Sequence, residues 1–409
     1  MPILNQKRPR DRFIKKYPRV LHGCRLSKSW SVLFLGLSCC FALSGDIMAQ
    51  SPGPVIVAYV FPQNNLIQRG DIAANKLTRI NYAFANLHDG RIVNGFTADD
   101  KNIAALVALK QENPSLTVLV SVGGWIWSAN FSDMALTRRS RRLFIESAVE
   151  FIDRNDLDGL DIDWEYPGQV GAGNQFRPAD KQNYTLLLKE LRARFNQEEK
   201  KDHRRLYITI ATGASSTFLI HTEMGKVQKY VDTINLMAYD YYEPDSDAVT
   251  GHHAPLFTNP NDPKKISAAQ SVKEYEQVGV QPSKIVLGVP FYGHVWGEVT
   301  AEDHGLFHPG KPIPHTYAQY SNISATMLNN GFTRYWDSIS SVPYLYNPET
   351  QIFVSYEDPQ SLGLKCKYVL DHKLGGIMFW DYEGDPGGTL LNAINVMLKK
   401  NTGTQSYGK

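Results

Sequence analysis

The sequence predicts an α/β protein, a (β/α)8 barrel with a small α+β insertion domain between its seventh and eighth strands. Three observations support this prediction. Eight apolar, β-branched runs alternate with amphipathic segments, which is the pattern of parallel βα units. The chain has 409 residues, 43% of them hydrophobic, which suffices for one large core. The alternation is interrupted once, between residues 294 and 357.

The expected strands are short runs rich in Val, Ile, Leu and aromatic residues. In chain order they cover 55–60, 77–85, 116–122, 157–163, 206–212, 231–239, 284–291 and 375–380. Amphipathic helices are expected between them, including 100–111, 138–155, 181–199 and 264–278. Both faces of a parallel barrel strand are covered, so continuous apolar runs are the pattern that such strands require.

The interruption at 294–357 is rich in Tyr, Pro, Gly and Asn and has no long helical pattern. Its run TRYWDSISSVPYLYNPETQIFVSYED predicts short antiparallel strands with a turn at Asn347-Pro348. We therefore expect the barrel in two parts, 50–293 and 358–400, on either side of an insertion domain at 294–357. Residues 401–409 are expected to form a flexible tail.

The first 49 residues resemble a secretory signal rather than part of the fold. Nine Lys and Arg against one acid precede the apolar run WSVLFLGLSCCFALSG, and Ala49 ends a plausible cleavage region. Secretion is the expected localisation; a retained membrane anchor or a lipoprotein signal is the alternative. The apolar run is shorter than the span of about 20 residues that a membrane helix needs.

Removing this leader changes the charge and the cysteine count. The remainder keeps 43 − 9 = 34 basic and 41 − 2 = 39 acidic residues, a net charge of about −5. This balance gives no indication of a nucleic-acid partner. Three of the four cysteines also leave, so Cys366 remains alone and no internal disulfide can form.

The stretch GLDIDWEYP, residues 159–167, carries the most specific chemistry. Asp161, Asp163 and Glu165 occupy every second position, so on a strand they share one face. Ile162 and Trp164 suit the helix-facing side, so the carboxylates should point into the barrel near its C-terminal mouth, where catalytic groups lie. Clustered carboxyls force at least one to hold a proton, as a general acid requires. Pairing with neighbouring Arg or Lys is the structural alternative, but no basic residue occurs from 157 to 175.

The motif DGLDIDWEYP resembles the D-x-x-D-x-D-x-E signature of glycoside hydrolase family 18, the chitinases and their relatives. Further similar stretches are INYAFA (80–85), SVGGW (121–125), INLMAYD (234–240), TGHHAPL (250–256), LGVPFYG (287–293) and GGIMFWDYEGD (375–385). The resemblance covers the chain from about residue 55 to 398. It implies a (β/α)8 barrel with a chitinase insertion domain, acting on β-1,4-linked N-acetylglucosamine.

The resemblance also implies roles for the acids. Glu165 would protonate the glycosidic oxygen, and the acetamido carbonyl of the substrate would attack C1 in place of an enzyme nucleophile. Asp163 would share a proton with Asp161 and then turn toward Glu165 and the acetamido group. Ser121 and Tyr59 would hydrogen-bond on the Asp161 side.

The fourth acid of the motif, Asp158, is out of phase with the others, and we expect it to be structural.

Further residues of the similar motifs would bind the sugar. Tyr239 would orient the acetamido carbonyl, and Asp240 would contact the distorted sugar or its acetamido group. Trp380 would form the apolar floor under the −1 sugar and Trp125 would stack on the +1 sugar, because sugar rings have apolar C–H faces.

Two inward residues of these motifs, Met237 and Tyr292, are also expected at the substrate. Tyr239 and the two tryptophans could instead be ordinary core residues.

The chain departs from the family pattern outside the acid motif. It has Tyr241-Tyr242-Glu243-Pro244 where His-Gly-x-Trp is common, and His294 where many members have Arg. The strand-one stretch YVFPQNN lacks a Trp that some relatives carry. These departures leave the outer subsites and the chain-length preference open.

The function expected is therefore a secreted chitinase acting on chitin and chitooligosaccharides, without a cofactor or metal, and as a monomer without a protein partner. An endo-β-N-acetylglucosaminidase acting on N-glycans or peptidoglycan-type chains is the alternative in the same fold. A non-catalytic chitin-binding lectin is a further alternative, although the motif keeps its acids. His252-His253 are adjacent and cannot form a metal site alone.

Overall fold

The computed structural model describes residues 53–313, 318–328 and 330–403, and for 400–403 only the backbone. The expected signal at 1–49 lies outside these residues. None of the described helices is long and apolar enough to cross a membrane.

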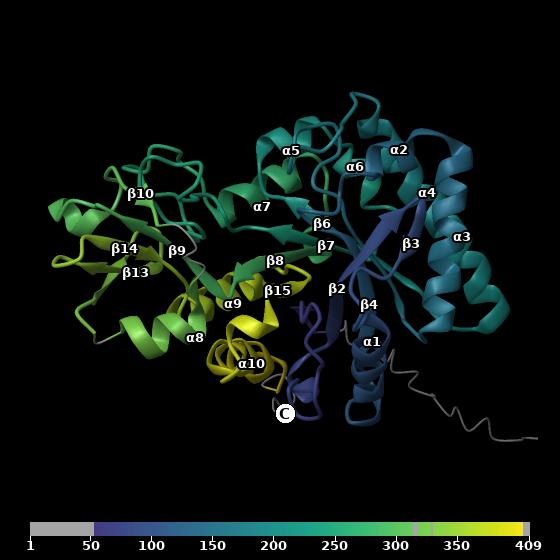
Figure 1. Cartoon of the computed structure of the whole chain (residues 1–409), viewed down its shortest axis with the longest axis horizontal. Helices are drawn as coiled ribbons and strands as arrows, with labels where there is room; N and C mark the ends of the chain where they lie inside the picture. The colour runs from purple at the N-terminus through teal and green to yellow at the C-terminus, as the bar shows by residue number, and fades with distance from the viewer. Residues whose placement is uncertain (1–52, 314–317, 329, 404–409) are drawn as a thin grey trace, which may run out of the picture. The chain divides into compact units, whose positions relative to one another are not determined.

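Eight parallel strands close into a barrel, which confirms the predicted fold class (Figure 1). Neighbours in the barrel follow the order of the chain, and the last strand pairs with the first. The strands are β1 (Val55–Val60), β2 (Arg79–His88), β4 (Thr117–Gly123), β5 (Gly159–Asp163), β6 (Tyr207–Gly213), β7 (Thr233–Met237), β8 (Ile285–Pro290) and β15 (Gly376–Trp380). A short strand, β3 (Arg91–Val93), extends β2 as an antiparallel hairpin.

Helices cover the outside of the barrel, with α3 and α4 side by side in Figure 1. Thr137 caps α3 by accepting from the backbone N–H of Ser140, and Ser267 caps α7 in the same way. The cap at Ser267 explains why α7 begins later than the amphipathic pattern suggests. The helices are α1 (Asp99–Ala108), α2 (Phe131–Leu136), α3 (Arg138–Arg154), α4 (Asp180–Asp202), α5 (Ser216–Ile220), α6 (Met224–Val227), α7 (Ala268–Gln277), α8 (Tyr320–Asn322), α9 (Pro359–Asp371) and α10 (Thr389–Gly403).

The last helix, α10, continues through residue 401, where we expected the tail to begin. Lys399, Lys400 and Asn401 contain no helix breaker, and the described helix ends at Gly403.

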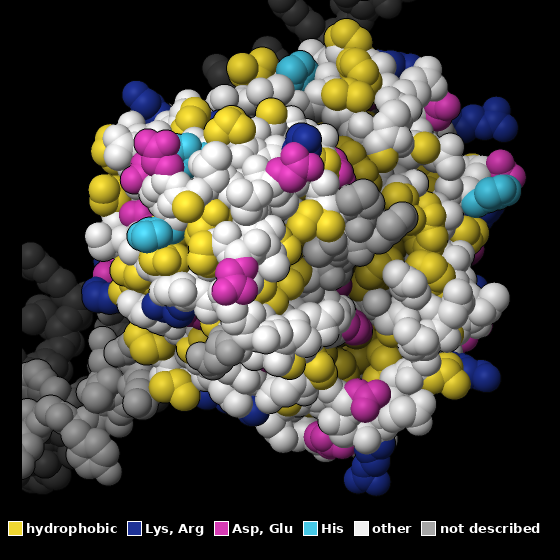
Figure 2. All heavy atoms as spheres, turned by 60° about the vertical axis from the view of Figure 1, so that its left-hand side comes forward, with side chains coloured by type: hydrophobic (Ala, Val, Ile, Leu, Met, Phe, Trp, Pro, Cys, Tyr) yellow, Lys and Arg dark blue, Asp and Glu magenta, His cyan; other side chains and the backbone are white. Residues whose placement is uncertain are grey.

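A second, six-stranded sheet follows β8 and consists of antiparallel pairs. The antiparallel strands and the turn after Asn347 agree with the sequence pattern, although the sheet begins at Tyr292, two residues before the expected domain boundary. Its strands are β9 (Tyr292–Gly297), β10 (Lys311–Pro312), β11 (Ala318–Gln319), β12 (Thr333–Asp337), β13 (Val342–Asn347) and β14 (Ile352–Ser355). In Figure 2 the Lys and Arg side chains on the displayed face are interspersed with Asp and Glu.

The core has two layers. The larger one lies between strands and helices and includes Ile162 and Trp164, so the apolar positions of the acid motif do face the helices. A smaller cluster fills the barrel interior and includes Tyr59, Met378 and the neighbouring Trp380. The alternate positions of β5 are therefore left for the carboxylates to point inward.

Candidate active site

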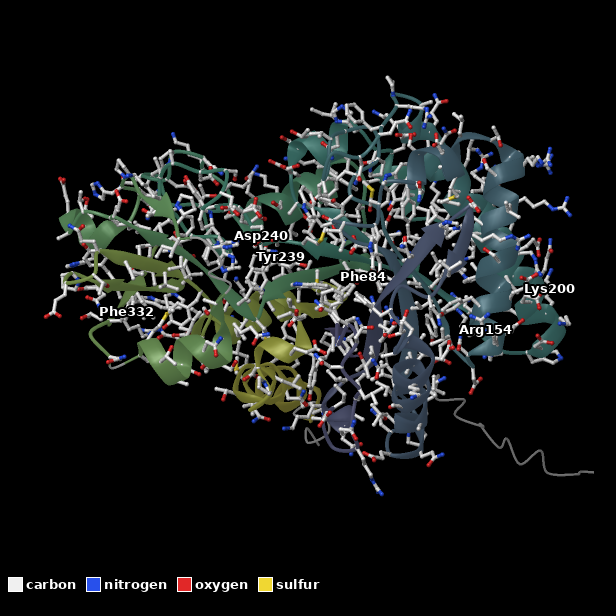
Figure 3. The ribbon with its side chains drawn as sticks, viewed as in Figure 1. Phe84, Arg154, Lys200, Tyr239, Asp240 and Phe332 are labelled. Carbon is white, nitrogen blue, oxygen red and sulfur yellow. The ribbon has the colours of Figure 1, made fainter. Side chains whose placement is uncertain are left out.

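A cleft with a volume of about 750 Å³ opens where the barrel strands end. Nine of the eleven residues expected at the substrate line it, and the other two, Asp161 and Ser121, are fully buried below. The nine are Glu165, Asp163, Tyr239, Asp240, Trp380, Trp125, Met237, Tyr59 and Tyr292. Figure 3 shows Tyr239 and Asp240 together after β7, with Phe84 of β2, another lining residue, nearby.

Asp161 is held by four hydrogen-bond donors from other strands. Tyr59 Oη and Ser121 Oγ donate to Oδ2 at 2.9 and 2.7 Å, as expected. Thr209 Oγ1 and Asn235 Nδ2 donate to Oδ1, the second at 3.2 Å, and neither was predicted. Burial raises the pKa of Asp161, while the hydrogen bonds from Thr209, Ser121 and Tyr59 oppose that rise.

The middle acid, Asp163, has a different environment. Its Oδ1 is buried and has no hydrogen-bond partner among the described residues. Burial, followed by the charges of Glu165 and Asp161, raises the pKa of Asp163 well above its usual range. The structure contains no hydrogen bond between the described Asp161 and Asp163 side chains, so their shared proton stays a prediction.

Glu165 lines the cleft and is 9% exposed. Burial raises its pKa to about 7; a hydrogen bond with Tyr166 opposes the rise, and the charges of Asp240 and Glu243 add to it. The Ser128 hydroxyl accepts from the Glu165 N–H at 2.9 Å and fixes the backbone. A carboxyl with this pKa is protonated in a substantial fraction of molecules near neutral pH.

Two glycines make room for this arrangement. Gly123, with φ of +111°, is the last residue of β4, and a Cβ there would lie 2.2 Å from the Asp163 carbonyl oxygen. A Cβ at Gly288 would lie 2.4 Å from the Leu236 carbonyl oxygen and 2.9 Å from the Tyr239 ring. Both sites therefore require glycine for the close approach of the catalytic strands.

Asp240 lies after the end of β7, and its backbone has a φ of 57°. Three side chains surround its Oδ1. Tyr292 Oη donates at 2.6 Å, His294 Nε2 lies at 2.8 Å and His253 Nδ1 at 3.6 Å. Burial alone would raise the pKa of Asp240, but the contacts with His253 and His294 outweigh it and hold the pKa below its usual range. Neither histidine was predicted to contact Asp240.

Aromatic rings form the apolar part of the cleft. Trp380 stacks on Phe84 with ring centroids 5.4 Å apart and an interplanar angle of 21°, and Phe61 lies 5.4 Å away on another side. Trp125 is 51% exposed at the edge, 6.3 Å from Tyr166. Phe61, Phe84 and Trp127 also line the cleft and were not predicted, because an aromatic on an apolar strand or in the turn after it gives no signal that separates a cleft wall from core.

Asp158 lies outside the cleft, as expected for a structural residue. Its Oδ2 accepts from the Val118 N–H at 2.7 Å and pairs with Lys110 Nζ at 2.8 Å. This acid therefore ties β5 to β4 and to the segment after α1.

A barrel whose mouth holds a buried acid with a pKa of about 7, flanked by carboxylates and aromatic rings, has the groups that acid-catalysed cleavage of a glycosidic bond requires. The model of the family "Glycosyl hydrolases family 18" matches residues 55–385, and the chain belongs to this family.

Relatives in the family carry chitinase and related names. Chitinase A1 of Niallia circulans is 40% identical over 312 residues, which are 73% of this chain and 44% of that protein. Chitinase 1 of Aphanocladium album is 31% identical over 379 residues, covering 83% of this chain and 84% of its own. The structure of a family 18 N-acetylglucosaminidase from Paenibacillus barengoltzii superposes with a TM-score of 0.77 and 38% identity, over 84% of this chain and 100% of its own. The chain thus spans less than half the length of the Niallia relative.

Proposed function

We propose that the chain hydrolyses β-1,4 bonds between N-acetylglucosamine units of chitin and chitooligosaccharides, with retention of configuration at C1. The observation that carries this proposal is Glu165, an almost buried acid with a pKa of about 7 beside Asp163 in an aromatic-lined cleft. The chitinase names of two relatives support the choice of substrate.

In the proposed first step Glu165 gives its proton to the glycosidic oxygen while the 2-acetamido carbonyl oxygen attacks C1. The C1–O bond breaks, the leaving sugar keeps the proton, and a positively charged oxazolinium remains. Asp163 stabilises the charge near the oxazolinium nitrogen, and Tyr239 orients the carbonyl oxygen. In the second step Glu165 takes a proton from water while the water oxygen attacks C1. The C1–O bond to the acetamido oxygen breaks, the N-acetyl group is restored, and the product is the β-anomer.

The remaining expected residues bind and position the sugar. Trp380, supported by Phe84, is the floor for the −1 ring, and the exposed Trp125 is placed to stack on the +1 ring. Asp240, held by Tyr292, accepts from the −1 sugar, and Met237 lines the same subsite.

Substitution of Glu165 by Gln tests this proposal. The variant should lose about 10²–10⁴ in kcat on N-acetylglucosamine hexamer while it keeps its fold and sugar affinity. Glu150→Gln, at an exposed acid on α3, is the matched control. Proton NMR of the first products should show the β-anomer. More than a tenth of wild-type kcat in the variant, or an initial α-anomer, would rule out the proposed mechanism.

An N-acetylglucosaminidase activity is the second candidate, because the Paenibacillus relative carries that name at 38% identity. Oligomers of defined length separate the possibilities. Release of internal dimers and trimers indicates a chitinase, release of single sugars from one end indicates an exo-acting N-acetylglucosaminidase, and cleavage of N-glycan cores indicates the endo-acting alternative. Sugar binding without any product would instead indicate a lectin.

The localisation that we propose is extracellular, after removal of residues 1–49 as a secretory signal. The basic leader and the short apolar run support it. The mass of the protein recovered from the medium should correspond to a chain that begins near residue 50. Recovery of the full-length chain from membranes would favour the anchor instead.

A further inference from the structure

Three side chains that are far apart in the sequence meet on one wall of the cleft. Asp240 follows β7, His253 lies in the next loop, and His294 lies on β9. His294 Nε2 is 2.8 Å and His253 Nδ1 is 3.6 Å from the same Asp240 Oδ1. One carboxylate oxygen and one nitrogen from each ring all lie within 4.8 Å of one another. The two imidazole rings are 4.7 Å apart and inclined by 71°, so their nitrogens can converge on one point.

The second observation is that the buried ring of His253 makes no hydrogen bond to the described part of the chain, although its Nδ1 lies 3.6 Å from Asp240 Oδ1. The side chain is fully buried, and neither ring nitrogen has a hydrogen bond among the described residues. Buried polar groups in folded proteins almost always have a partner, so this ring requires an explanation. Its neighbour His252 differs, because its Nε2 lies 3.2 Å from Asp337 Oδ2 in the second sheet.

We propose that Asp240, His253 and His294 form a binding site for a divalent transition-metal ion of the Zn²⁺ type. Two imidazoles and a carboxylate are ligands that zinc accepts with tetrahedral geometry, whereas Ca²⁺ and Mg²⁺ prefer oxygen ligands. Asp240 and His294 line the cleft, so an ion can reach them from it. The Tyr292 hydroxyl, which donates to Asp240 Oδ1 at 2.6 Å, orients the carboxylate ligand from outside.

The ion would act as an inhibitor. Asp240 is the residue that we propose to accept from the −1 sugar, so a bound ion and the substrate compete for one carboxylate. This consequence rests on the proposed function, whereas the binding of the ion does not.

Calorimetric titration of ZnCl2 into the full chain tests the site without an activity assay. We expect one saturable site, and His294→Gln should weaken binding by at least about tenfold. His252→Gln, next to the cluster but directed to Asp337, is the matched control and should keep the affinity. His294 is the preferred ligand to change, because it is partly exposed, while the buried His253 could be needed for folding.

Absorption of bound Co²⁺ gives a second readout, because a tetrahedral N/O site produces strong visible bands that His294→Gln should abolish. No saturation by 1 mM ZnCl2, or equal affinity in wild type and His294→Gln, would overturn the site. If ions bind but hexamer hydrolysis is unaffected at saturation, the site stands and the competition is overturned.

Discussion

The raised pKa of Glu165 should make the protein less stable at high pH, and Glu165→Gln should remove that loss. A carboxyl whose folded pKa exceeds its unfolded pKa stabilises the fold only while it is protonated. Its contribution is complete below the unfolded value and is lost as the pH rises through the folded value. The window for Glu165 therefore runs from about 4.5 to about 7.

The size of the effect follows from the shift. Each pKa unit corresponds to about 1.36 kcal/mol, so a rise from 4.5 to about 7 gives a limit of about 3 kcal/mol. Glu165 is only 9% exposed, so solvent screening reduces this figure little. With about 2.1 cal/mol/K of unfolding entropy per residue over roughly 350 residues, the difference corresponds to about 4 °C in Tm.

Scanning calorimetry of wild type and Glu165→Gln at pH 4.5, 6, 7 and 8.5 measures this difference directly. The Tm of the variant should rise relative to that of the wild type as the pH rises, by up to about 4 °C at pH 8.5. The difference in Tm should nearly vanish at pH 4.5. Glu150→Gln corrects for general effects of removing an exposed acid. A gap that is constant with pH, or one that favours the wild type at pH 8.5, would refute the burial argument.

Three further predictions concern charge and substrate. Glu243 is an exposed acid whose charge raises the pKa of Glu165, although less than burial does. Glu243→Gln should therefore shift the basic limb of the kcat/KM profile to lower pH by less than about one unit. A basic limb that stays in place or shifts to higher pH contradicts this. Lys365→Met leaves Glu357 buried without its ion-pair partner and should cost about 3–5 kcal/mol of unfolding free energy. The double variant Lys365→Met/Glu357→Gln should recover most of this lost unfolding free energy. Equal losses in the single and the double variant, measured by denaturant melts, would disprove the pairing argument. On partially deacetylated chitosan every new reducing end should be N-acetylglucosamine, as mass spectrometry can determine, and a substantial fraction of glucosamine ends would exclude attack by the acetamido group.

The barrel strands were predictable because both of their faces are buried, which gives continuous apolar runs. Short elements were not: β3, α5 and α6 have three to five residues each and show no clear period. The sixth barrel strand, β7, was predicted to reach Tyr239 but ends at Met237. The chain turns there into the positive φ of Asp240, which its apolar pattern does not reveal.

The acid motif was predictable because alternate residues of a strand share one face, however the strand is aligned with its neighbours. The donors to Asp161 were only half predictable, since Thr209 and Asn235 belong to strands whose alignment the sequence does not fix. A signal exists in retrospect: each is a polar residue at an inward position of an apolar strand, and Thr209 is in register with Asp161. The cluster of His253 and His294 on Asp240 depends on how the loop after β7 meets β9, which no local pattern encodes.

The three carboxyls of the acid motif are chemically alike, and their environments alone separate their pKa values. Asp161 has four donors, and the buried Arg79, which donates to Thr233, adds a positive charge that lowers its pKa against the effect of burial. Asp163 has no partner for one oxygen and lies between two other acids, so it holds a proton more readily. Burial therefore favours the protonated form more strongly at Asp163 than at Asp161, and we expect a proton shared by this pair to lie on Asp163, next to Glu165, before substrate binds.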